Sequence, residues 1–377
     1  MTLMTATAPD ERASRQLGPL APTDPSTHEA WFWRDIGGGE VECYLCYHAH
    51  VTSIKPGETC QCGARENRDG MLVTVDYGRL IACNVDEIEK RKLYHFHPGS
   101  LCLSFAAPGC NLHCRFCENW DLSQTCKTDG VAGVGQYLSP ADAVRLAATH
   151  GCTSVAAAYT EPTIFFEYAY DTAVHTREAG LKSVWVTNGQ ARERPLRMIA
   201  PYLDAVSIDL KCFSESTYQY LCGGHLGPVQ DNISLLKELG VHLEVSTPLI
   251  LGVNDSENEL SQLAAFLVSV DPDIPWHLVR FHPDFEMESP EITSSAALRH
   301  ARETGLAAGL RYVYADMPGG AGANTRCAHC DCLLIERPGT VPLQNHLSGG
   351  ACPDCGTPLP GGGLANGDVP PKSRPRV

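Results

Sequence analysis

Three cysteines on one short segment, Cys110-x-x-x-Cys114-x-x-Cys117, have a spacing typical of an iron–sulfur site. Thiolates are the usual ligands of iron–sulfur clusters, and a [4Fe–4S] cluster has four irons. Three thiolates therefore leave one iron open to a small molecule. A structural zinc ion would need a fourth ligand nearby, and His113, between the cysteines, would have an awkward reach. The spacing predicts a redox-active [4Fe–4S] cluster with one open iron.

A second group of cysteines forms two C-x-x-C pairs near the C-terminus. These pairs are Cys327–Cys330 and Cys352–Cys355. Their separation is close to that of a zinc ribbon, so structural zinc is favoured over a second iron–sulfur cluster. Cys332 is surplus to a four-ligand site. A third group lies near the N-terminus, where Cys43 and Cys46 form another C-x-x-C pair. It predicts a weaker zinc-like site, because its fourth ligand must be chosen.

The composition limits the function classes. The chain of 377 residues has 29 Lys and Arg against 44 Asp and Glu, a net charge of −15. Such an acidic chain is a poor candidate for binding nucleic acid or an anionic membrane surface. It has no run of 18 apolar residues and no apolar leader, so we expect no membrane span and no export. The 18 cysteines then indicate metal ligands in a reducing cytoplasm.

Short apolar runs alternate with amphipathic stretches from residue 101 onward, which is typical of β/α units around a parallel sheet. We expect helices at 141–149, 163–179, 232–239 and 256–270, with Ser139 capping the first. In the Cys-rich segment before them, residues 71–75 and 79–82 predict a strand pair. The expected strands of the parallel sheet are 101–106, 154–159, 183–186, 205–208, 243–246 and 277–281.

Five segments follow from this pattern. Residues 1–30 are expected to be a disordered leader and 361–377 a disordered tail. Residues 31–98 form an N-terminal Cys-rich module, 99–315 a partial barrel, and 316–360 a C-terminal zinc-ribbon-like module. The fold class is thus α/β, an incomplete (β/α)6 barrel with two small metal-stapled modules.

Polar side chains follow the ends of the expected strands, where the chemistry of β/α barrels takes place. Glu161 follows the second strand, and the segment 187–189 follows the third. Asp209 and Lys211 follow the fourth strand, and His282 follows the last. Turn chemistry is a sufficient explanation for Gly, Pro and Asn at such places, but less so for the charged residues.

The sequence Gly-Cys-Asn-Leu-His-Cys-Arg-Phe-Cys-Glu-Asn (109–119) resembles the cluster loop of radical S-adenosylmethionine (SAM) enzymes. The segments Ile-Glu-Lys-Arg-Lys-Leu-Tyr-His-Phe-His-Pro-Gly (88–99) and Tyr-Thr-Glu-Pro-Thr-Ile-Phe-Phe-Glu-Tyr (159–168) narrow the match. They resemble the AmmeMemoRadiSam radical SAM proteins, relatives of the pyruvate-formate-lyase activating enzymes. The resemblance covers roughly residues 40 to 360.

The resemblance implies that the open iron chelates the amino and carboxylate groups of SAM. It implies that Glu161 contacts the SAM amino group and that Thr187, Asn188 and Gly189 lie along SAM. Asp209 would help to hold a cation near the SAM carboxylate. Lys211 and His282 are the expected catalytic residues beside SAM, and Arg280 is a further candidate for a substrate or SAM contact. One departure is Val186, because the activating enzymes carry aspartate there.

The resemblance also bears on the N-terminal site, because the family has a cysteine at the position of His50. Cys43, Cys46, His50 and Cys62 are therefore the expected zinc ligands, with Cys60 and His48 as rivals. The surplus thiols Cys60 and Cys332 suggest a sharper hypothesis. With Cys330 as a possible third thiol, they would bind a soft substrate such as trivalent arsenic.

The sequence thus predicts an enzyme that cleaves SAM reductively and directs a SAM-derived radical at a small-molecule substrate. A low-potential donor such as flavodoxin or ferredoxin would supply the electron. One alternative is transfer of the 3-amino-3-carboxypropyl group of SAM to a thiophilic acceptor, and another is a glycyl-radical-enzyme activase. A non-catalytic alternative is an iron–sulfur electron carrier or a zinc-ribbon binding protein, although a carrier needs four ligands per cluster and no SAM pocket.

Overall fold

A computed structural model describes residues 27–47, 53–131 and 134–364. Its centre is an eight-stranded sheet in which all neighbouring strands are parallel except the first two along the chain. In sheet order the strands are β15 (Val313–Ala315), β14 (Trp276–Arg280), β13 (His242–Leu249), β12 (Ala205–Asp209), β11 (Lys182–Thr187), β10 (Ser154–Ala157), β8 (Leu101–Ala106) and β7 (Ala82–Glu87).

The six expected strands are confirmed as β8 and β10 to β14, and the α/β class with them. Two further strands were missed. β15 has only three residues, and β7 mixes polar with apolar residues and runs antiparallel to β8. β15 and β7 are the edge strands, so the sheet formed by the described residues is an open, partial barrel.

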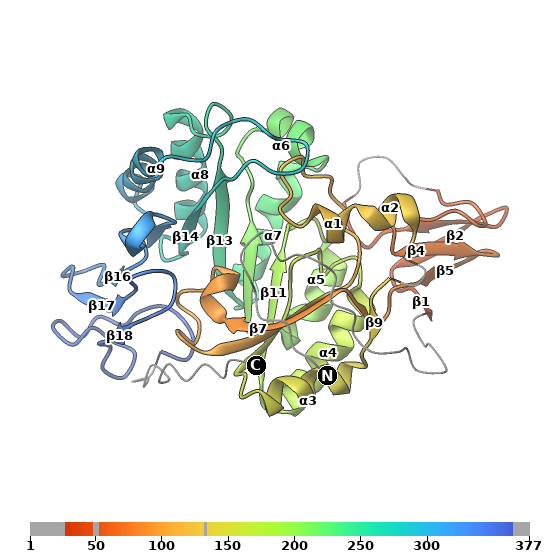
Figure 1. Cartoon of the computed structure of the whole chain (residues 1–377), viewed down its shortest axis with the longest axis horizontal. Coiled ribbons are helices and arrows are strands. Elements are labelled where there is room, and N and C mark those ends of the chain that lie inside the picture. The colour runs from red at the N-terminus through yellow and green to blue at the C-terminus, as the bar shows by residue number, and fades with distance from the viewer. Residues whose placement is uncertain (1–26, 48–52, 132–133, 365–377) are drawn as a thin grey trace.

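Helices cover one face of the sheet (Figure 1). Ser139 and Ser256 cap α3 and α8 by accepting a hydrogen bond from the third residue after each, as expected for serine at this position. α7 begins earlier than residue 232, because proline is tolerated in a first helical turn and Pro228 lies there. The main helices are α3 (Pro140–Thr149), α4 (Phe166–Glu178), α5 (Glu193–Ile199), α6 (Glu215–Cys222), α7 (Leu226–Glu238), α8 (Glu257–Val270) and α9 (Ser295–Ala307). Short turns of helix complete the fold: η2 (Ile88–Arg91), α1 (Trp120–Ser123), α2 (Thr125–Asp129), η3 (Ala200–Tyr202) and η4 (Pro318–Gly320).

The segment 88–99 packs on the opposite face of the sheet. Leu93 and Phe96 of this segment lie in a cluster with Ala156 of β10 and Val184 of β11. Because side chains alternate along a strand, the residues next to Ala156 and Val184 face the helices on the other side. Glu244 of β13, which is fully buried, fixes this segment by accepting hydrogen bonds from two of its backbone N–H groups. The four donors to Glu244 are Tyr94 N at 2.9 Å, His95 N at 2.8 Å, His242 Nε2 at 3.0 Å and His277 Nε2 at 2.7 Å.

The N-terminal module does not have the expected strand pair. β5 (Met71–Thr74) pairs with β4 (Arg65–Arg68) and β1 (His28–Glu29), whereas β6 (Arg79–Leu80) pairs with β9 (Gln136–Tyr137). The signal overlooked is Asp69-Gly70, a hairpin dipeptide in which both residues have positive φ. β2 (Trp33–Gly37) and β3 (Glu40–Cys43) form a second hairpin. The expected leader extends too far, because β1 is ordered and Ala30 is buried.

The C-terminal module contains β16 (Thr325–Arg326), β17 (Leu333–Glu336) and β18 (Gln344–Asn345). It lies across the sheet from the N-terminal module (Figure 1). The buried Arg337 joins it to the segment 88–99 by donating from Nη2 to the Tyr94 carbonyl at 2.8 Å. The disordered tail was expected to begin at residue 361, but the ordered structure extends beyond that point. Gly362 pairs with Phe96, and Leu364 is buried.

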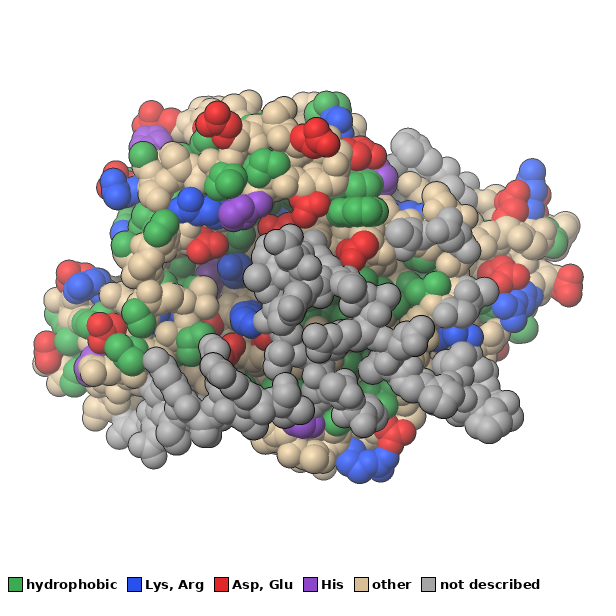
Figure 2. All heavy atoms as spheres, in the orientation of Figure 1, with side chains coloured by type: hydrophobic (Ala, Val, Ile, Leu, Met, Phe, Trp, Pro, Cys, Tyr) green, Lys and Arg blue, Asp and Glu red, His purple; other side chains and the backbone are tan. Residues whose placement is uncertain are grey.

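The surface carries charges of both signs, interspersed with apolar side chains on the face shown in Figure 2. Among the described helices, none combines the length and the apolar character that crossing a membrane requires.

Candidate functional site

The cysteine loop follows β8 and is clamped by the end of α6. His113 N donates to the Cys222 carbonyl and Arg115 N donates to the Leu221 carbonyl, both at 2.8 Å. The residues just after α6 lie so close to the loop that a Cβ on Gly224 would be 2.5 Å from Leu112 Cδ2. The loop is therefore held by the backbone of a neighbouring helix, in addition to its own turn.

The three thiols of this loop lie in different surroundings. The neighbouring Cys222 thiol holds the pKa of Cys114 below its usual range, against the effect of burial. Burial raises the pKa of Cys110 well above its usual range and that of Cys117 to about 11. The Cys117 sulfur lies 3.4 Å from Ser123 Oγ. Cys222 was not among the expected site residues, because a lone cysteine in a helix gives no signal in sequence.

The three thiols of the loop are less compact than those of the C-terminal cysteine group. Around a tetrahedral zinc with Zn–S bonds of about 2.3 Å, sulfur atoms lie roughly 3.8 Å apart. Among the described residues, only the C-terminal group has all its ligand atoms within 4.8 Å of one another. Cys110, Cys114 and Cys117 do not meet this spacing.

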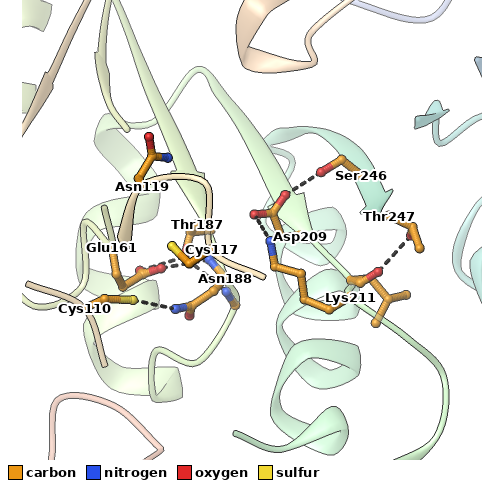
Figure 3. A network of polar contacts seen from close by, with 12 residues as sticks. Cys110, Cys117, Asn119, Glu161, Thr187, Asn188, Asp209, Lys211, Ser246 and Thr247 are labelled. Atoms are coloured by element: carbon orange, nitrogen blue, oxygen red, sulfur yellow. Dashed lines mark hydrogen bonds and ion pairs between the residues drawn. The ribbon is translucent and has the colours of Figure 1, made fainter. Parts of the chain in front are cut away.

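Glu161, which follows β10, is buried and ties together the ends of two strands (Figure 3). Its Oε1 accepts from Thr163 N at 3.0 Å, from Thr163 Oγ1, and from Thr187 Oγ1 at 2.8 Å. Its Oε2 accepts from Asn188 N at 2.8 Å. Burial raises the pKa of Glu161, although these hydrogen bonds oppose the shift. The carboxylate therefore fixes the segment after β11 in place.

Asn188 links this segment to the cysteine loop. Its Nδ2 donates to Asn111 Oδ1 at 2.7 Å and lies 3.7 Å from the Cys110 sulfur. Asn119, just after the last cysteine, donates to the Tyr159 carbonyl at 3.2 Å. Tyr159 has φ of 69°, which is uncommon for a non-glycine residue and marks this strand end as strained. Asn111 and Asn119 were not singled out in sequence, because asparagine in a loop is ordinary turn chemistry.

Asp209 and Lys211 lie on the other side of the same strand ends (Figure 3). Lys211 Nζ donates to Asp209 Oδ2 at 2.6 Å, and Ser246 Oγ donates to the other oxygen, Oδ1. Although burial opposes the charge of Lys211, Asp209 raises the pKa of Lys211 above its usual range. With both oxygens of Asp209 engaged and Val186 apolar, these residues do not fit a bound cation.

The last two expected residues are less well placed. Arg280 donates from Nε to the Asp316 carbonyl at 3.3 Å and from Nη2 to Ser295 Oγ at 3.2 Å, so it joins β14 to α9. His282 is exposed just beyond β14. The structure brings neither into the network of Figure 3.

A cavity of about 610 Å³ opens beside the cysteine loop. Arg115 of the loop, Tyr220 of α6 and Phe285 contribute to its wall. Phe285 also stacks on Trp120, with ring centroids 5.4 Å apart. The cavity is therefore bounded by the same loop and helix that surround Cys114.

The four expected C-terminal cysteines come together. The sulfur atoms of Cys327, Cys330, Cys352 and Cys355 all lie within 4.8 Å of one another. Each pair sits on a tight turn, in which the fifth residue, Asp331 or Gly356, has positive φ and donates its N–H back to the first cysteine. Four thiols at this spacing suit a single tetrahedral ion.

The two surplus thiols do not form a joint site. The Cys60 thiol interacts with Cys43 and Cys62 in the N-terminal module, whereas the Cys332 thiol interacts with Asp354 in the C-terminal module. Figure 1 shows these modules on opposite sides of the sheet. A soft substrate bound by both thiols is therefore excluded by the fold. His50 and His48 lie outside the described residues.

Comparisons with known proteins identify the family of the chain. Residues 105–264 match the model of the radical SAM superfamily. The chain is 35% identical over 311 residues to the uncharacterized protein MJ0808 of Methanocaldococcus jannaschii, covering 82% of this chain and 91% of that protein. It is 27% identical over 101 residues to the choline trimethylamine-lyase activating enzyme of Oleidesulfovibrio alaskensis, which is 27% of this chain and 33% of that one.

Among solved structures, a domain of pyruvate-formate lyase-activating enzyme from Bacteroides vulgatus is 22% identical. It covers 41% of this chain and 90% of that chain, with a TM-score of 0.35. SuiB of Streptococcus suis, bound to its precursor peptide SuiA, is 17% identical. The match covers 61% of this chain and 51% of SuiB, with a TM-score of 0.46. The cysteine motif, the family match and the long alignment to the archaeal relative concur: the chain belongs to the radical SAM superfamily.

Proposed function

We propose that this protein binds SAM at a [4Fe–4S] cluster held by Cys110, Cys114 and Cys117, and cleaves it reductively to a radical that acts on a small-molecule substrate. The main support for this proposal is the arrangement of three features at adjacent strand ends. These are the loop of the three cysteines, the Glu161–Asn188 network and the Asp209–Lys211 pair. When bound and reduced, the cluster supplies an electron to the sulfonium of SAM.

The residues around the loop suit the charges of SAM. SAM carries an ammonium, a carboxylate and a sulfonium, so its site needs groups of both signs and little water. Glu161 and Asp209 supply anionic groups, and Lys211 supplies the cation. The Lys211 ammonium, which is mostly buried, is the candidate partner for the SAM carboxylate.

Glu161 is proposed to act mainly by positioning. Its two oxygens already accept four hydrogen bonds from the protein, so its carboxylate holds Thr187 and Asn188 in place for SAM. A residual electrostatic attraction to the SAM ammonium adds to that role. Gly189, with φ of 74°, has no room for a side chain, because a Cβ would lie 2.9 Å from Ile208 Cδ1.

The substrate would reach the radical through the cavity beside Arg115 and Phe285, which mixes charged and aromatic groups. The activase alternative receives less support, because Val186 and the engaged Asp209 depart from the activases' expected cation site. A flavodoxin- or ferredoxin-like donor is the proposed source of the electron. The thiols of the C-terminal module are proposed to hold a structural zinc ion.

The test is whether SAM binds to the cluster. In the anaerobically reconstituted and reduced protein, SAM is expected to change the electron paramagnetic resonance spectrum of the cluster. Lys211→Met keeps the length of the side chain and removes its charge, so it is expected to raise the SAM concentration needed for that change. A cluster whose spectrum does not respond to saturating SAM would favour the electron-carrier alternative.

A further inference from the structure

The N-terminal module lies directly on the catalytic site. Tyr47 N donates to the Gln190 carbonyl at 2.7 Å, and Arg192 N donates to the Leu45 carbonyl at 3.0 Å. Residues 45–47 therefore extend along the segment that follows Asn188. On the other side, a Cβ on Gly109 would lie 2.5 Å from the Cys62 carbonyl oxygen, so the module also contacts the start of the cysteine loop.

Four thiols of this module gather at that contact. Cys43 and Cys60 pack against the same hydrophobic clusters, one of which contains the buried Cys62, and the Cys60 thiol interacts with the thiols of both Cys43 and Cys62. Cys46 is near enough to Cys43 and Cys62 to interact with them electrostatically. Cys60 and Cys62 lie on a tight turn, in which Gly63 has φ of 80° and donates its N–H to the Cys60 carbonyl at 2.9 Å. The C-terminal pairs also lie on turns that contain a residue of positive φ, but there the N–H donates back over four residues instead of three.

Two buried donors near these thiols lack a partner. Arg65 is 1% exposed, and its guanidinium interacts with Cys43 and Cys62, yet its Nε has no hydrogen-bond partner within the described structure. Its terminal nitrogens are engaged by Glu167 and the Trp31 carbonyl. Asn111 Nδ2, which lies beside the Cys46 thiol, is also buried without a partner there. Unsatisfied buried donors are costly, and thiolate sulfur would accept from both.

We propose that Cys43, Cys46, Cys60 and Cys62 together hold a soft metal, zinc or iron, in a four-thiolate site that abuts the catalytic loop. Cys60 is the fourth ligand in place of His50. A metal with four thiolates is an anionic centre, and Arg65 Nε is a donor available to it while the Nη2 of the same guanidinium is paired with Glu167. The site would fix residues 43–47 against the segment that follows Asn188.

The thiols are less compact than those of the C-terminal group, which alone among the described residues meets the 4.8 Å spacing. A cysteine side chain has one torsion with three staggered positions, so rotation moves the sulfur without moving the backbone. Because the four thiols interact with one another within one small module, the proposal requires their side chains to close around the metal. Binding would release thiol protons, as metal–thiolate sites do.

The first test uses the unaltered protein. Its cysteines are alkylated before and after treatment with a strong chelator, and each peptide is read by mass spectrometry. We expect Cys43, Cys46, Cys60 and Cys62 to become reactive together on chelation. Buried Cys83, outside any thiol group, is the control that should stay protected. Alkylation of Cys60 while the other three stay protected, or no response of the four to the chelator, would overturn the proposal.

The second test counts metals in full-length variants. Cys60→Ser is expected to lose the metal of this site, about one equivalent if it is zinc and more if it is an iron cluster. His50→Ala should retain it, and Cys330→Ser should lose a separate equivalent from the C-terminal site. Retention of all metal by Cys60→Ser, or the same loss in His50→Ala, would contradict the assignment. Neither readout depends on SAM cleavage, so failure here leaves the proposed reaction untouched.

Discussion

Replacing Glu161 with glutamine should weaken SAM binding through the position of Asn188. Glutamine keeps the shape of the side chain but replaces one carboxylate oxygen with an NH2 group. If the amide oxygen stays with the Thr163 and Thr187 donors, the NH2 group meets the N–H of Asn188, which now donates at 2.8 Å. The charge-assisted hydrogen bond from Asn188 N is lost, and the N–H of Asn188 then faces the NH2 group of the glutamine, so two donors repel each other.

Loss of such a bond costs about 1.5–3 kcal/mol. If SAM binding must restore the position of Asn188, the dissociation constant of SAM rises roughly tenfold to a hundredfold, since each 1.4 kcal/mol is about a factor of ten. Anaerobic titration calorimetry with the reconstituted protein measures this change. Glu178→Gln, an exposed glutamate of α4, is the matched control and should bind SAM normally. Unchanged SAM affinity in Glu161→Gln, with a cluster of normal spectrum, would refute the positioning role.

Glu244→Gln should lower the free energy of unfolding at pH 7 by about 2–5 kcal/mol, because a buried carboxylate with four donors loses its charge. Although burial disfavours the charge, hydrogen bonds from His242 and His277 hold the pKa of Glu244 well below its usual range. Its stabilisation is therefore present above about pH 4.3 and lost at lower pH, so denaturant unfolding should show the difference narrowing there. Cys222→Ala should make the midpoint potential of the cluster more negative, because the neighbouring thiol that stabilises the anionic Cys114 sulfur is removed. Removing the proposed zinc ion with a chelator should lower the thermal stability of the C-terminal module, because metal binding there is coupled to folding.

Each of these expectations has an outcome that contradicts it. A constant difference in unfolding free energy from pH 7 to pH 3 would show that the charge of Glu244 is not what stabilises the segment 88–99. A redox titration of Cys222→Ala that matches the parent protein would show that the Cys222 thiol does not reach the cluster. Cys222→Ser, which keeps a donor, should shift the potential less than Cys222→Ala. A thermal stability of the C-terminal module that the chelator leaves unchanged would argue against a zinc ion there.

Much of the fold could be predicted because its signals are local. Strands such as β8 and β11 contain short apolar runs, Leu-Cys-Leu and Val-Trp-Val, and Ser139 marks a helix start by its type alone. The spacing of Cys110, Cys114 and Cys117 carries the chemistry of the site in eight consecutive residues. The chain could therefore be placed in its superfamily from one loop.

What was missed depends on contacts distant in sequence. The partner of β6 is β9, more than fifty residues away, so no local pattern distinguishes it from the nearer β5. Cys222 reaches Cys114 only because α6 folds back onto the loop. The hydrogen bonds of Glu161 were also not predicted, since sequence placed it at a strand end but gave no sign that the protein engages its oxygens. The hypothesis of a soft-substrate site that joins Cys60 and Cys332 required the two Cys-rich modules to meet. The fold places these modules on opposite sides of the sheet.

The central claim is tested most directly by the fate of SAM. The protein is reconstituted without oxygen, mixed with SAM and a strong reductant, and the products are identified by mass spectrometry. The account predicts SAM consumption that requires both the reductant and the cysteines of the loop, with 5′-deoxyadenosine as the product of an adenosyl radical. Methylthioadenosine would instead indicate transfer of the aminocarboxypropyl group. Intact SAM beside a fully reduced cluster would contradict the claim that this protein is a SAM-cleaving enzyme.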